Sequence, residues 1–323
     1  MSLQDRSLGR GSHGAPCPCE SGLGCSKGSG EVWILQRQKA DAAKNPNTAR
    51  LLQALLAQGI AARPVDPGRV DQTGGPWALR LAGQPVAAPR GLIGRSGSNT
   101  GAAARALSAM LETIGTAAFP TATVLALAGD KLSAGRLLAA AGLPTPDFAE
   151  IGPTADPHAV GARFGWPLVL KAARGSKGRS VRLVERPEAL APTIADLLRQ
   201  GPLVAQRFVA ESRGRDMRVI VIGGTAIGAM AREAPGAHPF RSNIASGGVG
   251  RSVVLSPDIA ELAEAAARTA GLEIAGVDLL LADGGFTICE VNSAPGFVAF
   301  EAVTGIDVAG AIARHVATRL SQH

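Results

Sequence analysis

The stretch GVDLLLADGGFTICEVNSAPG, residues 276–296, decides the fold that we expect for the surrounding chain. It contains two apolar runs, residues 277–282 and 286–291, which are joined by the turn DGG. An Asp-Gly turn between two runs of strand-forming residues is a strong signal for a β-hairpin. The sequence therefore predicts two antiparallel strands that pair along this segment.

Three polar side chains interrupt this apolar hairpin. Asp278 lies in the first strand, and Glu290 and Asn292 end the second. Residues two apart on a strand share a face, so Glu290 and Asn292 point the same way and the hairpin can bring Asp278 beside them. Carboxylates on an apolar surface are costly without a cation, and oxygen ligands of this kind suit Mg²⁺. We predict a metal site here; the alternative is an edge hairpin whose polar residues face water.

Length and composition indicate a globular protein of several subdomains. The chain has 323 residues, of which 46% are hydrophobic and 18% are charged. This length suffices for two or three packed subdomains. No apolar run reaches the roughly 18 residues that a membrane helix needs. The first residues are polar and glycine-rich, without the apolar centre of a secretory signal, so we expect a cytoplasmic protein without membrane contact.

The charge balance favours an acidic partner. The net charge is +7, from 33 basic and 26 acidic residues. Such a charge also suits nucleic acid, but tyrosine is absent and aromatic residues make up only 3% of the chain, so base-stacking platforms are poorly supplied. We therefore expect no direct nucleic-acid recognition. An acidic small molecule or an acidic peptide fits the charge better.

The cysteines predict neither a zinc site nor a disulfide framework. Cys17, Cys19 and Cys25 lie in the tail near His13, but their spacing does not match an ordinary zinc motif. Residues 1–30 have no periodic apolar pattern, and we expect a disordered tail without a chemical role. Cys289 alternates with Glu290 along its strand, so we predict a small buried side chain on the opposite face.

The rest of the chain alternates helix and strand patterns. Residues 31–120 predict a small open α/β domain, in which the glycine-rich turn GRSGSNTG at residues 94–101 connects a strand to a helix. A phosphate-binding turn is the alternative for that segment. Further along we expect strands at 166–172 and 203–209, a hairpin over 218–230 and a long loop over 232–250. We expect helices at 48–58, 99–115, 130–141, 187–200, 257–270 and 307–320.

The second half of the chain resembles the ATP-grasp superfamily and, within it, the RimK group of glutamate ligases. The motifs that carry this resemblance occur in order: DKL at 130–132, PLVLK at 167–171, the glycine loop at 175–181, GRDMRV at 214–219, FRSN at 240–243, AGVDLL at 275–280, ICEVNSAPGF at 288–297 and TGIDVAG at 304–310. The resemblance implies an α/β (α+β) ATP-grasp fold. An N-terminal pre-ATP-grasp domain (31–120) would precede a central subdomain with the glycine-rich loop (121–200) and a C-terminal subdomain with the Mg²⁺ site (201–323).

The resemblance also implies residue roles. Lys171 ends a buried strand, where an ammonium needs an anion such as a nucleotide phosphate. Arg232 and Arg241 match catalytic positions, and Asp278, Glu290 and Asn292 match the metal ligands. The implied ATP site consists of Lys131, Lys171, Gly175, Ser176, Gly178, Gln206, Arg207, Phe208, Asp216, Arg241, Ser242 and Asn243.

Two of these positions also fit a purely structural role, and two residues depart from the family pattern. Lys131 also suits a helix surface, and Asp216 also suits an ion pair with Arg215 or Arg218. Ser180 stands where the family usually has glycine, and Arg207 stands where it usually has an acidic residue. We expect ATP to remain acceptable beside Arg207, because the adenine contacts of this segment are largely made by the backbone.

The implied activity is ATP-dependent ligation of a carboxylate to an amine through an acyl phosphate, with L-glutamate as donor. The cofactors are ATP and Mg²⁺, with two ions expected and Mn²⁺ as a substitute. The acceptor is a ribosomal small-subunit protein tail, another acidic peptide, or a small cofactor or amino-acid metabolite. A nucleotide-binding module without catalysis is the rival hypothesis, and a homo-oligomer stays open. We expect Asp278→Asn and Glu290→Gln to abolish turnover and leave the fold intact.

Overall fold

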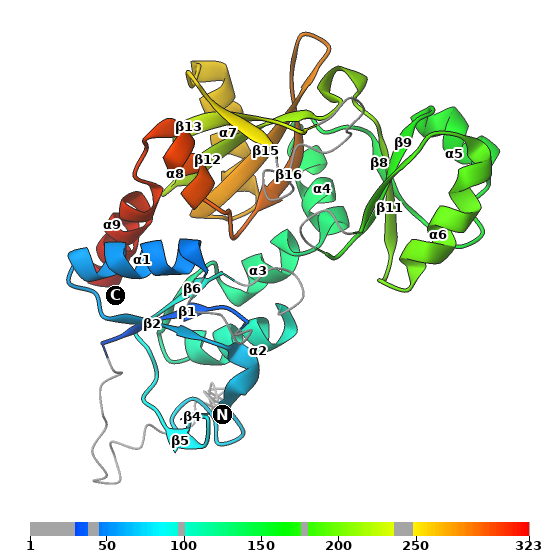
Figure 1. Cartoon of the computed structure of the whole chain (residues 1–323). Coiled ribbons are helices and arrows are strands. Elements are labelled where there is room, and N and C mark those ends of the chain that lie inside the picture. Colours follow the sequence, from blue (N-terminus) through cyan, green and yellow to red (C-terminus); the bar gives the residue numbers. More distant parts are fainter. Residues whose placement is uncertain (1–29, 38–44, 96–100, 176–179, 236–247, 323) are drawn as a thin grey trace, which may run out of the picture.

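The computed structural model describes residues 30–37, 45–95, 101–175, 180–235 and 248–322. Three larger sheets and one small sheet organise these residues, and helices pack on the faces of the larger ones (Figure 1). The mixed α/β (α+β) architecture predicted from the sequence is confirmed. Among the described residues, none of the helices combines the length and the apolar character needed to cross a membrane.

The N-terminal sheet is parallel and has the order β2-β1-β6-β7. Its strands are β1 (Val32–Leu35), β2 (Ala62–Val65), β6 (Gly91–Gly94) and β7 (Ala117–Phe119). All four residues of β1 are buried because both faces are covered. Trp33 and Leu35 face α2 (Gly101–Glu112), whereas Val32 and Ile34 face α1 (Pro46–Ala57). A 3₁₀ turn, η3 (Pro67–Arg69), and a small sheet of β3 (Val70–Asp71), β4 (Arg80–Leu81) and β5 (Gln84–Pro85) lie between β2 and β6.

The central sheet is antiparallel and has the order β10-β9-β11-β8. Its strands are β8 (Phe148–Ile151), β9 (Leu168–Ala172), β10 (Val181–Val184) and β11 (Leu203–Arg207), and its covering elements are α5 (Pro157–Phe164), η5 (Pro187–Ala189) and α6 (Leu190–Leu198). Two helices, α3 (Ala122–Ala128) and α4 (Lys131–Ala140), lead into it. The sequence analysis ended the central subdomain at residue 200, but β11 comes after that residue and lies between β9 and β8 in this sheet. We therefore propose that the central subdomain ends after β11.

The third sheet has the order β14-β13-β12-β15-β16, and all its neighbouring strands are antiparallel. After the 3₁₀ turn η6 (Ala210–Ser212), its strands are β12 (Arg215–Ile222), β13 (Thr225–Glu233), β14 (Val249–Val253), β15 (Ile274–Ala282) and β16 (Gly285–Asn292). The hairpin predicted over residues 276–296 is confirmed as β15 and β16. Asp283 and Gly284 both have positive φ, as a type I′ turn requires.

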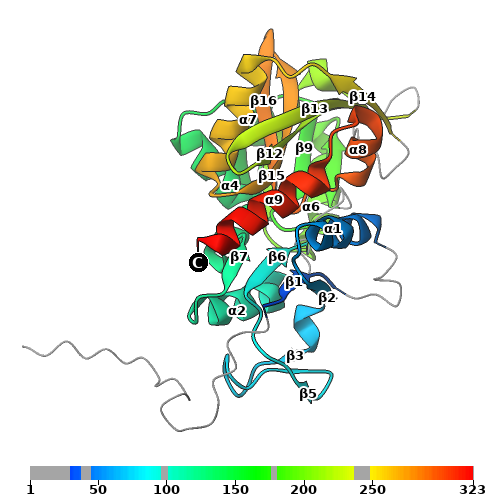
Figure 2. The ribbon, with the colours of Figure 1, turned by 90° about the vertical axis from the view of Figure 1, so that its left-hand side faces the viewer.

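The two faces of this sheet have different coverings. Val219 and Val277 face α7 (Pro257–Thr269) and the end of α4. Ile220 and Ile274 face the other way, toward α8 (Val298–Thr304) and α9 (Val308–Ser321). The 90° turn in Figure 2 shows α7 and α9 on opposite sides of the strands. Period-two alternation of apolar residues in β12 and β15 produces this division.

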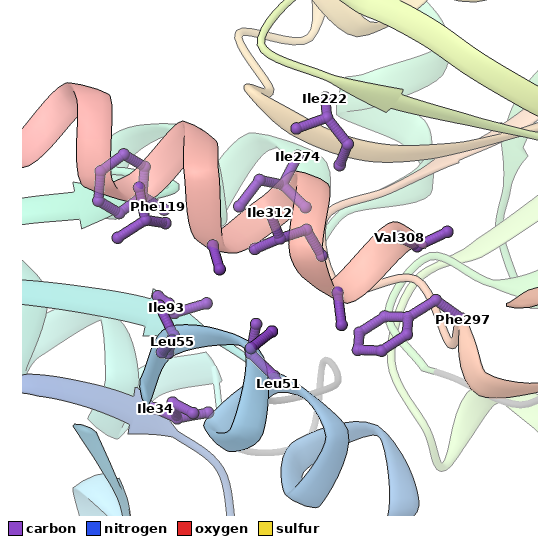
Figure 3. Packing of buried hydrophobic residues seen from close by; sticks show 14 of the residues in the cluster. Ile34, Leu51, Leu55, Ile93, Phe119, Ile222, Ile274, Phe297, Val308 and Ile312 are labelled. Atoms are coloured by element: carbon purple, nitrogen blue, oxygen red, sulfur yellow. The ribbon is translucent and has the colours of Figure 1, made fainter. Parts of the chain in front are cut away.

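Helix α9 joins the first sheet to the third. Ile312 packs in one apolar cluster with Ile34 and Leu55 from the N-terminal region and with Ile222 and Ile274 from the third sheet (Figure 3). Each such fully buried side chain contributes about 1.5–3 kcal/mol, so this cluster fixes the N-terminal sheet against the C-terminal subdomain. At the same junction, Asn47 Oδ1 accepts hydrogen bonds from Phe297 N (2.7 Å) and Val298 N (3.1 Å).

Candidate active site

A row of charged side chains crosses the third sheet beyond the helices that cover it. Arg232 on β13 lies opposite Asp216 on β12, and Arg218 on β12 lies opposite Asp278 on β15. Asp278 in turn lies opposite Glu290 on β16. Asp216 and Arg218 share the face of Ile220, so the row continues the face on which α8 and α9 pack.

The arginines and aspartates in this row alternate in charge and bind one another through paired contacts. Arg218 donates to both Asp278 oxygens, from Nε at 2.8 Å and from Nη2 at 2.7 Å. Arg232 donates to both Asp216 oxygens at 2.6 and 2.5 Å, and its Nη2 atom lies 3.0 Å from Asp278 Oδ2. Two cations therefore balance two anions, and paired hydrogen bonds fix their orientation.

Burial and charge oppose each other in this cluster. Burial alone would raise the pKa of Asp278, but the Arg218 and Arg232 guanidiniums outweigh it and hold that pKa below its usual value. Burial likewise acts to lower the pKa of Arg232, and the Asp278 and Asp216 carboxylates outweigh it and raise that pKa. Asp278 and Arg232 are therefore both charged at neutral pH.

The three predicted metal ligands come together at the end of this row. Asn292 Nδ2 donates to Asp278 Oδ2 at 3.3 Å, and Glu290 stands directly across the strand pair from Asp278. Within the described part of the chain, Glu290 has no hydrogen-bond or ion-pair partner. Among the same residues, no group of three or more His, Cys, Asp or Glu side chains is arranged to hold a metal ion. Two carboxylates and an amide fit Mg²⁺, which usually takes one or two carboxylates and completes its shell with phosphate and water.

A pocket lies beside Glu290, between α4, the central sheet and β16. Its lining includes Lys131, Lys171, Gln206, Cys289 and Glu290. Lys171 is buried and donates from Nζ to Gln206 Oε1 at 2.8 Å. Burial lowers the pKa of Lys171, and the charge of Glu290 counters part of that effect. A buried ammonium bound to a neutral amide is suited to receive a phosphate.

Lys131 joins this pocket to the start of the glycine-rich loop. Its Nζ atom donates to the carbonyl of Gly175 at 2.7 Å, and Asp130 caps the first turn of α4 by accepting from Ser133 N. Gly175 has a φ of +144°, which side-chain-bearing residues rarely adopt, and an added Cβ would lie 3.0 Å from Ser180 Oγ. Lys131 therefore lies in the pocket rather than on an open helix surface.

The prediction for Cys289 is wrong in its direction. We expected this side chain to face away from Glu290, but both line the same pocket. The cause is a β-bulge: the register shifts between Asp278 and Leu279, which pair with Glu290 and Ile288, so Cys289 is the extra residue on β16. A bulge interrupts the strict alternation on which the prediction rested.

Other residues predicted to bind ATP lie outside the pocket lining. Arg207 is exposed and donates from Nη2 to the carbonyl of Arg163 at 2.8 Å. The Phe208 ring lies under the Arg213 guanidinium, 4.9 Å from its Cζ. Asp216 does form an ion pair, and Arg232, which the sequence analysis did not suggest as its partner, takes part in it. Five predicted positions lie outside the described residues: Ser176, Gly178, Arg241, Ser242 and Asn243.

Arg218 is the residue of this site that the sequence analysis missed. We treated it only as a partner for Asp216, yet it forms the paired contact with Asp278. A signal was present, since Asp216 and Arg218 are two residues apart on one strand and therefore share a face. Which strand pairs with β12 could not be predicted from local sequence, and that pairing decides the partner.

Known proteins with the same architecture define the class. The D-cycloserine synthetase DcsG superimposes with a TM-score of 0.70 at 20% identity over 90% of this chain and 99% of that chain. A RimK domain ATP-grasp protein from Sphaerobacter thermophilus superimposes with a TM-score of 0.66 at 23% identity. The superposition covers 88% of this chain and 98% of that chain. At these identities the likeness shows the fold alone, which is the ATP-grasp fold.

Sequence comparison identifies the family within that class. Residues 128–316 match the model of the RimK-like ATP-grasp domain. The chain is 34% identical over 274 residues to a probable alpha-L-glutamate ligase 2 of Shewanella frigidimarina, covering 82% of this chain and 90% of that protein. It is 32% identical over 277 residues to a probable alpha-L-glutamate ligase of Xanthomonas campestris, covering 84% and 94%. The chain belongs to the RimK-like ATP-grasp family and is an ADP-forming ligase that uses ATP and Mg²⁺.

Proposed function

We propose that this ligase adds L-glutamate to a carboxylate-bearing acceptor. ATP transfers its γ-phosphoryl group to an acceptor carboxylate, which gives ADP and an acyl phosphate. The glutamate amine then attacks the acyl carbon, the C–O bond to phosphate breaks, and the nitrogen loses a proton. The products are an amide, ADP and phosphate. Binding both substrates in one site accounts for much of the rate enhancement, because the reacting groups are already held together and need not meet by diffusion.

The observation that carries this proposal is the placement of Glu290. Its carboxylate lies opposite Asp278 on the sheet and also lines the pocket that contains Lys171. Because Glu290 lies both in the pocket and beside Asp278, a cation bound to it could contact nucleotide phosphates in the pocket and the charged row on the sheet. We propose that Asp278, Glu290 and Asn292 hold two Mg²⁺ ions, with Mn²⁺ as a substitute. When bound, these ions neutralise the phosphates during transfer.

The remaining residues take roles that follow from their contacts. Lys171 and Lys131 bind phosphate oxygens, and Gln206 orients Lys171 through its 2.8 Å hydrogen bond. Arg232 is held by two aspartates, so it stays in place and stabilises charge that develops on the acyl oxygen. Arg241, Ser242 and Asn243 are proposed for the triphosphate end on the family motif alone.

The acceptor that we propose is an acidic peptide, of which a ribosomal small-subunit protein tail is one candidate. Two named ligases among the relatives support glutamate as donor, and the net charge of +7 supports an acidic acceptor. A second acceptor class, a small acidic cofactor or amino-acid metabolite, fits the same charge. The complete set of Asp278, Glu290 and Asn292 opposes the rival view of a nucleotide-binding module without catalysis.

An ADP-release assay tests this function. Purified protein with Mg-ATP and a peptide ending in glutamate is supplied with single amino acids in turn. The expected result is ADP and phosphate with L-glutamate, together with a product heavier by one glutamyl unit. Release of AMP and pyrophosphate, or equal use of neutral amino acids, contradicts the proposal. A set of small dicarboxylic acceptors run in parallel separates the two acceptor classes.

A further inference from the structure

Arg95 occupies a position in the N-terminal domain where ligands commonly bind. It follows β6 directly, and its backbone N–H donates to the carbonyl of Leu35 at 2.8 Å, so it extends the parallel sheet by one residue. In open α/β sheets, ligands bind in the crevice outside the carboxyl ends of the strands. For the turn at residues 94–101, which includes Arg95, the sequence favoured a connecting role and left phosphate binding as the alternative.

The guanidinium of Arg95 differs from comparable arginines in its charge environment. Three guanidinium nitrogens are buried without a hydrogen-bond partner among the described residues: Arg63 Nε, Arg95 Nη1 and Arg319 Nε. Arg63 Nε lies 3.0 Å from Glu31 Oε2, and Arg319 Nε lies 3.0 Å from Glu273 Oε2. Arg95 has no such carboxylate in the described ranges. Burial accordingly lowers the pKa of Arg95 to about 10.

An aromatic ring from the segment that follows β16 orients this guanidinium. Arg95 Cζ lies 5.1 Å from the centroid of the Phe297 ring, which is fully buried. Phe297 is five residues after Asn292, and Asn47 Oδ1 fixes its backbone N–H. Figure 3 shows the Phe297 ring at the end of the apolar cluster, beside the start of α9. The cation–π contact orients the guanidinium but supplies no anion, and the described residues supply none either.

We propose that Arg95 binds a carboxylate of the substrate, one that takes no part in the reaction. The inference rests on the proposed function, in which both L-glutamate and the acidic acceptor carry carboxylates beyond the reacting groups. A shielded guanidinium gains most from an anion that meets two of its N–H groups, and a carboxylate has that geometry. The N-terminal domain thereby contributes directly to substrate choice, and Arg95 is a binding residue rather than a catalytic one.

The test compares Arg95→Met and Arg95→Lys with the matched control Arg63→Met. Arg63 also stacks on a buried aromatic ring, with its Cζ 5.3 Å from the Trp33 centroid, but it has Glu31 as a partner. Isothermal titration measures binding of L-glutamate and, separately, of a short glutamate peptide, each to protein saturated with Mg²⁺ and a non-hydrolysable ATP analogue. Affinity for that analogue and the melting temperature of each variant are measured alongside.

The expected result is a loss of at least about tenfold in affinity for one probe in Arg95→Met, as for one lost charged hydrogen bond. Arg95→Lys keeps the charge but lacks the paired N–H groups, so its affinity for that probe should lie between those of the parent and Arg95→Met. Nucleotide affinity stays unchanged, and Arg63→Met binds both probes like the parent. Arg95→Met melts no lower than the parent, since it removes an uncompensated buried charge, whereas a purely structural arginine would lower the melting temperature.

Each outcome decides something about the proposal. Loss of L-glutamate binding assigns Arg95 to the donor, and loss of peptide binding assigns it to the acceptor. Unchanged binding of both probes, a parent that binds neither, or a loss of nucleotide affinity instead would overturn the proposal. If the parent releases no ADP with any amino acid but still shows Arg95-dependent probe binding, the proposed function fails and the carboxylate site stands.

Discussion

Arg232 lies 3.0 Å from Asp278 while its guanidinium also binds both oxygens of Asp216, so one cation holds three neighbouring strands together at the candidate active site. Arg218 also binds Asp278 and contacts both of its carboxylate oxygens. The carboxylate that the sequence predicted as a metal ligand is therefore also the centre of a buried ion cluster. A substitution at Asp278 must change stability as well as chemistry.

Asp278→Asn is expected to abolish ADP release and to lower the free energy of unfolding by about 3 kcal/mol, because Arg218 and Arg232 are left with one carboxylate between them. From the sequence we expected this variant to lose turnover with its fold intact, and the ion cluster adds the expected loss of stability. Urea unfolding and the ADP assay measure the two effects. A variant as stable as the parent would show that the cluster is not balanced by Asp278.

Glu290→Gln is the matched variant on the facing strand. Glu290 has no direct partner among the described side chains, so its neutral isostere should change the free energy of unfolding by no more than about 0.5 kcal/mol. ADP release should still be lost, because a proposed Mg²⁺ ligand has been removed. Normal ADP release in either variant would refute the metal assignment.

Lys171→Met is expected to weaken ATP binding by about tenfold or more and to leave the melting temperature unchanged or higher. Its ammonium is buried against the neutral Gln206 amide, so the folded state bears a desolvation cost that phosphate would offset. Deletion of residues 1–30 serves as the control, since that sequence has no apolar pattern. Normal ATP affinity for Lys171→Met combined with an inactive truncation would contradict the nucleotide-site assignment.

Local pattern was enough to predict the parts of this site that lie on one hairpin. Asp278, Glu290 and Asn292 could be placed near one another because an Asp-Gly turn joins their two strands. The register of the turn alone would set Asp278 opposite Cys289, and the bulge brings it opposite Glu290 instead. The contacts of Arg218 and Arg232 with Asp278 depend on the order β13-β12-β15, and β15 is far from the other two strands in the sequence. Cys289 was misplaced because a bulge of one residue leaves no mark in the apolar pattern.

The pocket beside β16 gives a steric test that does not depend on charge. Cys289 lines it between Ile288 and Glu290, so Cys289→Phe should block nucleotide binding, whereas Cys289→Ala should bind ATP within about threefold of the parent. Equilibrium titration with a fluorescent ATP analogue measures both variants, and circular dichroism checks that both are folded. Equal affinity for the Phe and Ala variants would place the nucleotide elsewhere.

Glu273 gives a prediction on pH and stability at the junction of α9 with the third sheet. A hydrogen bond from His315 Nε2 at 2.7 Å lowers the pKa of Glu273 from its reference value of 4.5, and Arg319 adds to this effect. A carboxyl group with a lowered pKa stabilises the fold above pH 4.5 and loses that contribution as the pH falls through the lowered value.

Glu273→Gln should therefore reduce the free energy of unfolding at pH 7, by no more than about 1 kcal/mol because the carboxylate is 37% exposed and solvent screens it. The difference from the parent should shrink steadily as the pH is lowered from 4.5 toward 3. Urea unfolding at several pH values measures this, with Glu261→Gln as the control, since Glu261 is exposed on α7. A difference that is the same at pH 7 and pH 3 would show that Glu273 acts through packing and not through its charge.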